Sequence, residues 1–193
     1  MANSLYERVK SLAESPHAEL ALASVAFAES SFFPVPPDVL LAPMALAEPK
    51  KAWRFALIAT LASVLGGMLG YAIGAALYDT LGQWLVNLYG YGAKMEALKQ
   101  TYAEWGWLVI LVKGATPIPY KLVTITSGLL GYNFALFVLL SALTRGVRFF
   151  LVAGALHWFG EPVRAAREKN FAAVLGGFAL LVVLGFVVAV KIF

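Results

Sequence analysis

The chain has 193 residues, of which 61% are hydrophobic and 13% are charged, and it contains no cysteine. Soluble domains are about 45–50% apolar and about 25% charged, and a soluble chain of this length cannot bury so much apolar surface, which excludes an ordinary soluble enzyme. A disordered protein is also excluded, because disorder requires low hydrophobicity. The lack of cysteine excludes a disulfide scaffold, a thiolate metal site and a cysteine nucleophile, and the excess of 15 Lys and Arg over 11 Asp and Glu is more typical of loop sidedness in a membrane protein than of nucleic-acid binding.

The first 47 residues contain two predicted segments. Residues 1–19 mix charged and apolar residues, a pattern that predicts an interfacial amphipathic helix. Residues 20–47 form an apolar run that is interrupted in its middle by acids and prolines: Glu29, Pro34, Pro36, Pro37 and Asp38. Because proline cannot continue a helix, this run is not one continuous helix, and each apolar arm is too short to cross a membrane alone.

The middle of the chain combines one long apolar run with a polar segment. Residues 52–78 carry one charge near their start and none after it, which predicts a membrane-spanning helix. Residues 79–104 mix acids, lysines and apolar residues, so we expect an amphipathic loop or helix on the opposite face of the membrane.

The second half repeats this arrangement and adds a further apolar run. Residues 105–131 are interrupted by Lys113, Pro117, Pro119 and Lys121. Residues 134–159 and 171–192 are each long enough to span, and the first of these carries Arg145 and Arg148 near its centre. The sequence therefore predicts a single all-α integral membrane domain over 1–193, with three or more spanning helices.

The two interrupted runs have two possible structures, a broken spanning helix or a re-entrant hairpin that returns to its starting face. Irregular backbone survives at membrane depth only where protein or water covers it. If both runs are hairpins, the basic segments at 8–10, 50–54 and 164–169 lie on one face, which the positive-inside rule makes cytoplasmic. The placement of lysine and arginine therefore favours two re-entrant hairpins.

The two halves resemble each other, which indicates an internal repeat. The Pro-x-Pro at 34–36 corresponds to the one at 117–119, and a charged residue follows the first proline by four positions in both. The long runs match at an offset of 78, so that Ser63 falls on Ser141, and the pair Gly67 and Gly70 falls on Arg145 and Arg148. Hairpins that enter from opposite faces would make the repeat inverted, with a binding site near the midplane.

Six ionisable residues are predicted to lie at membrane depth, where each costs about 2.5–3.5 kcal/mol on insertion scales. They are two acids and four bases: Glu29, Asp38, Lys113, Lys121, Arg145 and Arg148. The surplus of positive charge favours an anion such as a phosphate headgroup. The proline positions predict helix starts at Asp38 and Tyr120, which would aim amide protons at the membrane interior, and Thr116 and Thr124 are further candidates for binding the substrate.

Several of these features also have purely structural interpretations. Glu29 with one arginine is then a structural ion pair, Asp38 is a helix cap, and the two lysines reach an interface. The glycines at 66, 70 and 74, spaced by four, favour a close helix-packing stripe over a ligand loop. No metal ligands cluster in the sequence, and we expect neither a metal nor a cofactor.

These residues resemble a known family. Glu29, the FPVPPD run at 33–38, the GGMLGY run at 66–71 and KGATPIPYK at 113–121 resemble the DedA family of bacterial membrane proteins, with its VTT domain, and within it the YqaA-like branch. The resemblance implies two opposed re-entrant hairpins among membrane helices, and lipid transport, including recycling of undecaprenyl phosphate. It assigns Glu29 and Asp38 to the family's acidic positions. Lys113 and Lys121 match its basic pair, although the family usually has arginines, which are spaced R-x-x-P-x-x-R.

The function that we expect is therefore transport, not catalysis. The leading hypothesis is a multi-pass transporter or scramblase of an anionic lipid phosphate in the bacterial cytoplasmic membrane, with the bases binding the headgroup and the two acids pairing with them in the empty site or carrying a coupling proton. The alternatives are a proton- or cation-coupled transporter of a small solute and a non-transporting interaction protein. The expected partners are membrane lipids and a possible second copy of the chain, and nucleic acid is not expected.

Overall fold

The computed structural model describes residues 15, 17–33, 35–115 and 120–165, and every regular element in these ranges is helical. The elements in chain order are α2 (Ala18–Ser31), α3 (Asp38–Ala47), the short 3-10 helix η1 (Pro49–Lys51), α4 (Ala52–Leu77), the π-helix η2 (Tyr78–Gly82), α5 (Gln83–Leu88), α6 (Gly92–Ala115), α7 (Tyr120–Leu129) and α8 (Phe134–Ala165). The predicted all-α fold class is thus confirmed for the described residues.

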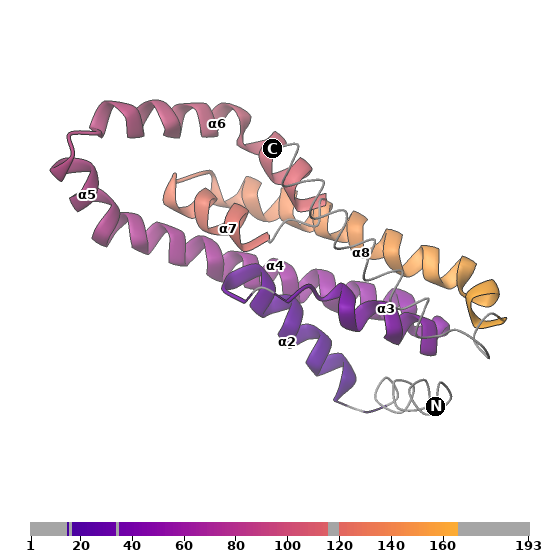
Figure 1. Ribbon diagram of the computed structural model, residues 1–193. Coiled ribbons are helices and arrows are strands. Elements are labelled where there is room, and N and C mark those ends of the chain that lie inside the picture. The colour runs from indigo at the N-terminus through magenta and orange to yellow at the C-terminus, as the bar shows by residue number, and fades with distance from the viewer. Residues whose placement is uncertain (1–14, 16, 34, 116–119, 166–193) are drawn as a thin grey trace.

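The two long helices α4 and α8 pack against each other in opposite directions (Figure 1). Tyr71, near the end of α4, packs on Phe134 at the start of α8, while Trp53 at the start of α4 stacks on Phe150 further along α8. Both helices correspond to runs that the sequence predicts to be long helices. The helical stretches Pro49–Leu88 and Phe134–Trp158 are the two in the described part of the chain that are long and apolar enough to cross a membrane.

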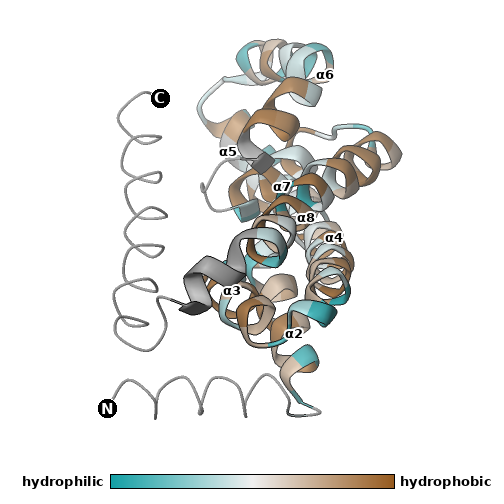
Figure 2. Cartoon of the chain, turned by 90° about the vertical axis from the view of Figure 1, so that its right-hand side faces the viewer, coloured by the Kyte–Doolittle hydropathy of each residue, from teal (hydrophilic) through white to brown (hydrophobic). Residues whose placement is uncertain are grey.

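The outer faces of α4 and α8 are apolar and exposed. Leucines at four-residue spacing lie on the outside of α4, and large apolar side chains repeat along the outside of α8: Leu57, Leu61, Leu65 and Leu69 on α4, and Leu139, Leu143, Val147 and Leu151 on α8. In Figure 2 hydrophobic residues predominate on the helices, and α6 carries much of the hydrophilic colour. Such faces are suited to contact with lipid tails rather than with water. The third predicted span, at 171–192, lies outside the described residues.

The chain reverses direction at each of the two helix breaks. α2 runs parallel to α4, because Gly66 lies beside Phe27 and Gly70 beside Ser30, whereas α3 runs with α8. Likewise α6 runs with α8, since Tyr102 packs on Tyr132 just before α8 and the Thr144 hydroxyl further along donates to the Leu111 carbonyl, and α7 runs parallel to α4. We call α2–α3 the first hairpin and α6–α7 the second, and Figure 1 shows that they enter the bundle from opposite ends.

The contacts of the two halves are equivalent. α2 packs on α4 as α6 packs on α8, and α3 packs on α8 as α7 packs on α4. Each half thus places one hairpin arm on its own long helix and the other arm on the long helix of the opposite half. This exchange is what two halves related by an inverted repeat produce, and it brings the end of α2 beside the start of α7.

Glycines on α4 allow both hairpins to approach its backbone. A Cβ atom at Gly66 would lie 2.0 Å from the Phe27 carbonyl oxygen of α2, and one at Gly74 would lie 1.9 Å from the Ile125 carbonyl oxygen of α7. A Cβ atom at Gly128 of α7 would in turn lie 1.9 Å from the Tyr71 carbonyl oxygen. The predicted packing role of the glycine stripe is therefore confirmed.

One described segment, α6, differs in extent from the predicted bounds. α6 begins at Gly92 and continues to Ala115, so it crosses residues 104–105, where the sequence places the start of the second interrupted run. A turn precedes α6, and in it Gly90 has a φ of 66°, a conformation that glycine adopts without a Cβ penalty. The predicted interfacial helix at 1–19 lies almost entirely outside the described residues.

Candidate functional site

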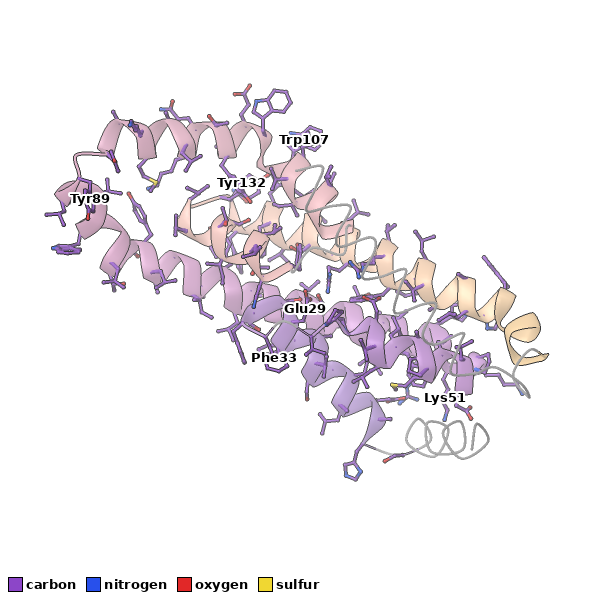
Figure 3. All side chains as sticks on the ribbon, viewed as in Figure 1. Glu29, Phe33, Lys51, Tyr89, Trp107 and Tyr132 are labelled. Carbon is purple, nitrogen blue, oxygen red and sulfur yellow. The ribbon has the colours of Figure 1, made fainter. Side chains whose placement is uncertain are left out.

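The centre of the bundle holds a buried ion pair between the first hairpin and α8. Arg145 Nη2 donates to Glu29 Oε2 at 2.7 Å, and the side chains are 2% and 7% exposed. The other oxygen, Glu29 Oε1, accepts the backbone N–H of Tyr120 at 2.9 Å, where α7 begins. One carboxylate therefore ties α2 to α8 and to the start of α7, and Figure 3 shows Glu29 near the middle of the bundle.

Two serines extend this pair onto α4. Arg145 Nε donates to Ser63 Oγ at 2.7 Å, and Ser63 Oγ shares a hydrogen bond of 2.6 Å with Ser30 Oγ. The Ser30 hydroxyl also donates a hydrogen bond of 3.2 Å to Glu29 Oε2. Thr124 of α7 joins the cluster by donating to the Ser30 carbonyl at 2.9 Å. Serine hydroxyl groups thus bond to both Glu29 and Arg145, which lowers the cost of burying these two charges.

A second ion pair joins the other arm of the first hairpin to α8. Arg148 Nη2 donates to Asp38 Oδ2 at 2.6 Å, and the side chains are 15% and 4% exposed. Arg145 and Arg148 are three residues apart, so they lie on one face of α8, and each forms an ion pair with one acid of the first hairpin. The predicted neighbourhood of both acids and both arginines is present in the structure.

Aromatic residues line the arginine on its other side. The Arg145 guanidinium lies 4.9 Å from the ring centre of Tyr120 and 4.7 Å from that of Phe149. The Tyr120 hydroxyl shares a hydrogen bond of 2.7 Å with Ser141 Oγ on α8. These rings contact the guanidinium by cation–π interaction at a place where the Arg145 side chain is almost fully buried.

Lys121 has a different environment from the arginines. Its Nζ donates to the Phe32 carbonyl at 3.3 Å, and the side chain is partly exposed. Among the described residues it has no carboxylate partner, because the two buried acids pair with the arginines instead. Among the described residues of the cluster, the positive surplus that the sequence predicts therefore falls on Lys121.

The structure describes only some of the predicted site residues. Glu29, Asp38, Arg145, Arg148 and Thr124 lie in the cluster at the meeting point of the hairpins, with Lys121 beside it. Pro36 and Pro37 lie in the first helix break, and α3 and α7 begin at Asp38 and Tyr120 as predicted. The remaining predicted residues have side chains outside the described part of the chain: Lys113, Thr116, Pro34, Pro117 and Pro119.

One structural interpretation of the acids can now be decided. The first amide groups of α3 bond to the carbonyls of Pro36 and Pro37, and no side chain caps this helix. Asp38 is therefore not a helix cap. Glu29 does form an ion pair that bridges hairpin and bundle, and this geometry is compatible with both a structural and a transport role.

Sequence reasoning missed the residues that connect the charges. Ser30, Ser63, Tyr120 and Ser141 were not expected at the site, although they form its hydrogen-bond framework. The alignment of Ser63 with Ser141 at an offset of 78 is the signal that could have found two of them. Among the described residues no group of three His, Asp or Glu side chains lies close enough to hold a metal ion.

Comparison with known proteins gives a family to this architecture. The family model of the VTT domain matches residues 35–157. The chain is 36% identical to an uncharacterized protein of Haemophilus influenzae over 185 residues, which are 94% of each chain, and 34% identical to an uncharacterized protein of Histophilus somni over 166 residues, 86% of each. No solved structure gave a significant match. The chain therefore belongs to the VTT-domain family, the DedA family of membrane proteins.

Proposed function

We propose that the protein moves a lipid with an anionic phosphate headgroup across the bacterial cytoplasmic membrane. The observation that carries this proposal is the position of the charge cluster. Two acids and two arginines, with Lys121 beside them, lie where the breaks of two opposed hairpins meet, inside a bundle whose outer faces are apolar. Ionisable residues in such a place mark a transport pathway more often than a purely structural feature.

The cluster is suited to an anion that exchanges with the protein's own carboxylates. In the empty site both arginines are neutralised by acids of the first hairpin, so the buried charges are balanced. An arriving phosphate adds negative charge, which Lys121 and the start of α7 can compensate, since cations and helix N-termini both attract phosphate. The acyl or isoprenoid tail stays in the lipid outside the bundle, because the outer faces offer it no polar groups.

Access to the cluster from the two sides of the membrane follows from the hairpin arrangement. If both hairpins are re-entrant, each is attached to one face of the membrane only, and a small shift of one against the other opens the cluster to that face. The glycine stripe of α4 favours such shifts, since both hairpins contact the α4 backbone at the glycines, where no side chains interlock.

A transport assay in proteoliposomes tests the proposal. Fluorescent lipid phosphates in the outer leaflet are quenched with a membrane-impermeant reductant, and the protected fraction reports movement. Lys121→Met is expected to lower the rate at least about tenfold, because it removes one full charge from the phosphate site, whereas Lys121→Arg keeps the charge and most of the rate. Lys94→Met is the matched control, since Lys94 lies on α6 against the ring of Tyr91, away from the cluster.

The outcomes separate this proposal from the alternatives. Wild-type protein that moves no lipid, with or without a proton gradient, refutes it. Flux of a small solute that follows a pH gradient without lipid movement would instead support a solute transporter in which Glu29 or Asp38 carries the proton. Equal rates for Lys121→Met and Lys94→Met would show that the lysine does not contact the transported group.

Cysteine labelling tests the re-entrant topology independently, since the chain has no cysteine of its own. Single cysteines at Ser15 and Lys51, which flank the first hairpin, are expected to react with an impermeant thiol reagent from the same face of the membrane. A cysteine at Gly92, beyond α4, is expected to react from the other face. Labelling of Ser15→Cys and Lys51→Cys from opposite faces would mean that the first hairpin crosses the membrane.

A further inference from the structure

The two buried acids differ in how completely their oxygens are hydrogen-bonded. Both oxygens of Glu29 have donors, from Tyr120 on one side and from Arg145 and Ser30 on the other. Asp38 Oδ2 accepts from Arg148, but Asp38 Oδ1 is buried and has no hydrogen-bond partner among the described residues. Native proteins rarely leave a buried carboxylate oxygen in this state, so the atom calls for an explanation.

The helix to which Asp38 belongs does not supply the missing donor. The amides of Val39, Leu40 and Leu41 are already bonded to the carbonyls of Pro36 and Pro37. The pair is also the more open of the two, since the Arg148 side chain is 15% exposed and that of Arg145 is 2% exposed. Of the two buried pairs, the one that contains Asp38 therefore has the more accessible base.

We infer that Asp38 and Arg148 are the pair that contacts the ligand, and that they receive a phosphate monoester in its protonated form. In this arrangement Arg148 binds an unprotonated phosphate oxygen, and the P–OH group of the same phosphate donates to Asp38 Oδ1. Glu29 and Arg145 then serve as the fixed contact between the hairpins, because their oxygens and nitrogens are already engaged by four different helices. The assignment rests on the proposed function for its location at a phosphate site.

The chemistry at Asp38 selects between two classes of phosphate. A monoester near its second pKa, about 6, carries a P–OH group in a large fraction of the molecules. A phosphodiester has no such proton at any physiological pH, so it would bring an oxygen against Asp38 Oδ1 and leave both acceptors without a donor. The protein charges beside Asp38, namely Arg148 and the pair of Glu29 with Arg145, are the same for both classes.

The test compares two lipids that differ by one methyl group on the phosphate. Short-chain phosphatidic acid is a monoester, and phosphatidylmethanol is its diester with the same chains. Binding of each to the purified full-length protein in detergent is measured by equilibrium titration at about pH 6, close to the second pKa of the monoester. Wild-type protein is expected to bind phosphatidic acid about tenfold more tightly, the effect of one hydrogen bond to a buried charged group.

Two variants locate the preference. Asp38→Asn puts an amide N–H2 group where the acceptor was, so the tenfold preference is expected to vanish or to reverse. Glu19→Gln makes the same acid-to-amide change in the exposed pair of Glu19 with Arg54, outside the cluster, and the ratio of the two affinities is expected to stay as in the wild type. Melting curves of both variants check that each is folded, and the comparison of the two lipids on wild-type protein requires no variant.

Each outcome decides one question. Equal affinities of the wild type for the two lipids, or a preference that survives in Asp38→Asn, overturn the assignment. A binding preference without lipid movement in proteoliposomes supports the assignment and refutes the proposed transport, whereas movement without a preference overturns the assignment alone. Glycerol 3-phosphate is expected to compete with phosphatidic acid, because it has the same phosphate monoester group. Failure to compete overturns the assignment. Uptake of glycerol 3-phosphate into vesicles would identify a free phosphate ester as the transported species.

Discussion

Breaking the pair between Glu29 and Arg145 gives the most direct test of how the two hairpins are held together. Arg145→Met removes the guanidinium that bonds to Glu29 at 2.7 Å and to Ser63 at 2.7 Å. Glu29→Gln keeps the shape of the side chain but places an amide N–H2 group or a neutral oxygen against the guanidinium. Each single change leaves one charge buried at the centre of the bundle without its partner.

The expected loss follows from burial. Both side chains are more than nine-tenths buried, and removing one partner of a buried ion pair costs about 3–5 kcal/mol, mostly because the other charge is left uncompensated. The double variant Glu29→Gln with Arg145→Met carries no charge at this place. We therefore expect its loss of stability to be smaller than the sum of the two single losses by about 2–3 kcal/mol.

Equilibrium unfolding in mixed micelles measures the free energies of the four proteins. A double variant whose loss equals the sum of the single losses would mean that the two charges do not interact, and the pairing in the structure would be wrong. The cycle with Arg54→Met and Glu19→Gln is the matched control. That pair also lies at 2.8 Å, but the Arg54 side chain is 67% exposed, so its coupling is expected to be below about 1 kcal/mol.

Two further predictions concern packing and hydrogen bonding. Gly66→Ala places a Cβ atom 2.0 Å from the Phe27 carbonyl oxygen and is expected to destabilise the protein by about 1–3 kcal/mol or more. In Gly67→Ala the new Cβ atom meets only side-chain atoms at 3.4 Å or beyond, so the stability is expected to change little. Melting temperatures in detergent compare the two variants, and equal values would refute the backbone contact. Tyr120→Phe removes the hydroxyl that bonds to Ser141 and is expected to cost about 1 kcal/mol without changing the pairing of Arg145, which unfolding and a crystal structure of the variant can check.

Much of the fold follows from local rules that act along the chain. Runs of apolar residues predict the long helices α4 and α8, because only helices satisfy their own backbone in lipid. Prolines predict both helix breaks, and the starts of α3 and α7 at Asp38 and Tyr120 agree with the residues that precede them. The four-residue spacing of Gly66, Gly70 and Gly74 predicts a close approach on one face of α4, although the sequence does not say which helices approach.

The site itself depends on contacts between distant parts of the chain. Glu29 and Arg145 are 116 residues apart, and Asp38 and Arg148 are 110 apart. Residue types and charge balance predict that acids and bases meet, but the lysines and arginines are equivalent in that argument. Which acid meets which base depends on the rotation of each helix about its axis and on the depth at which the hairpins meet.

The amino-acid sequence alone determined that this is an α-helical membrane protein with charged residues beside two proline-containing breaks, because hydropathy, helix length and proline geometry are local properties. Only the tertiary structure decided that both acids pair with arginines, that serines of α2 and α4 complete the network, and that one oxygen of Asp38 has no partner. Those outcomes arise from the packing of five helices around the cluster, and a pattern read along one dimension does not contain the angles at which helices pack.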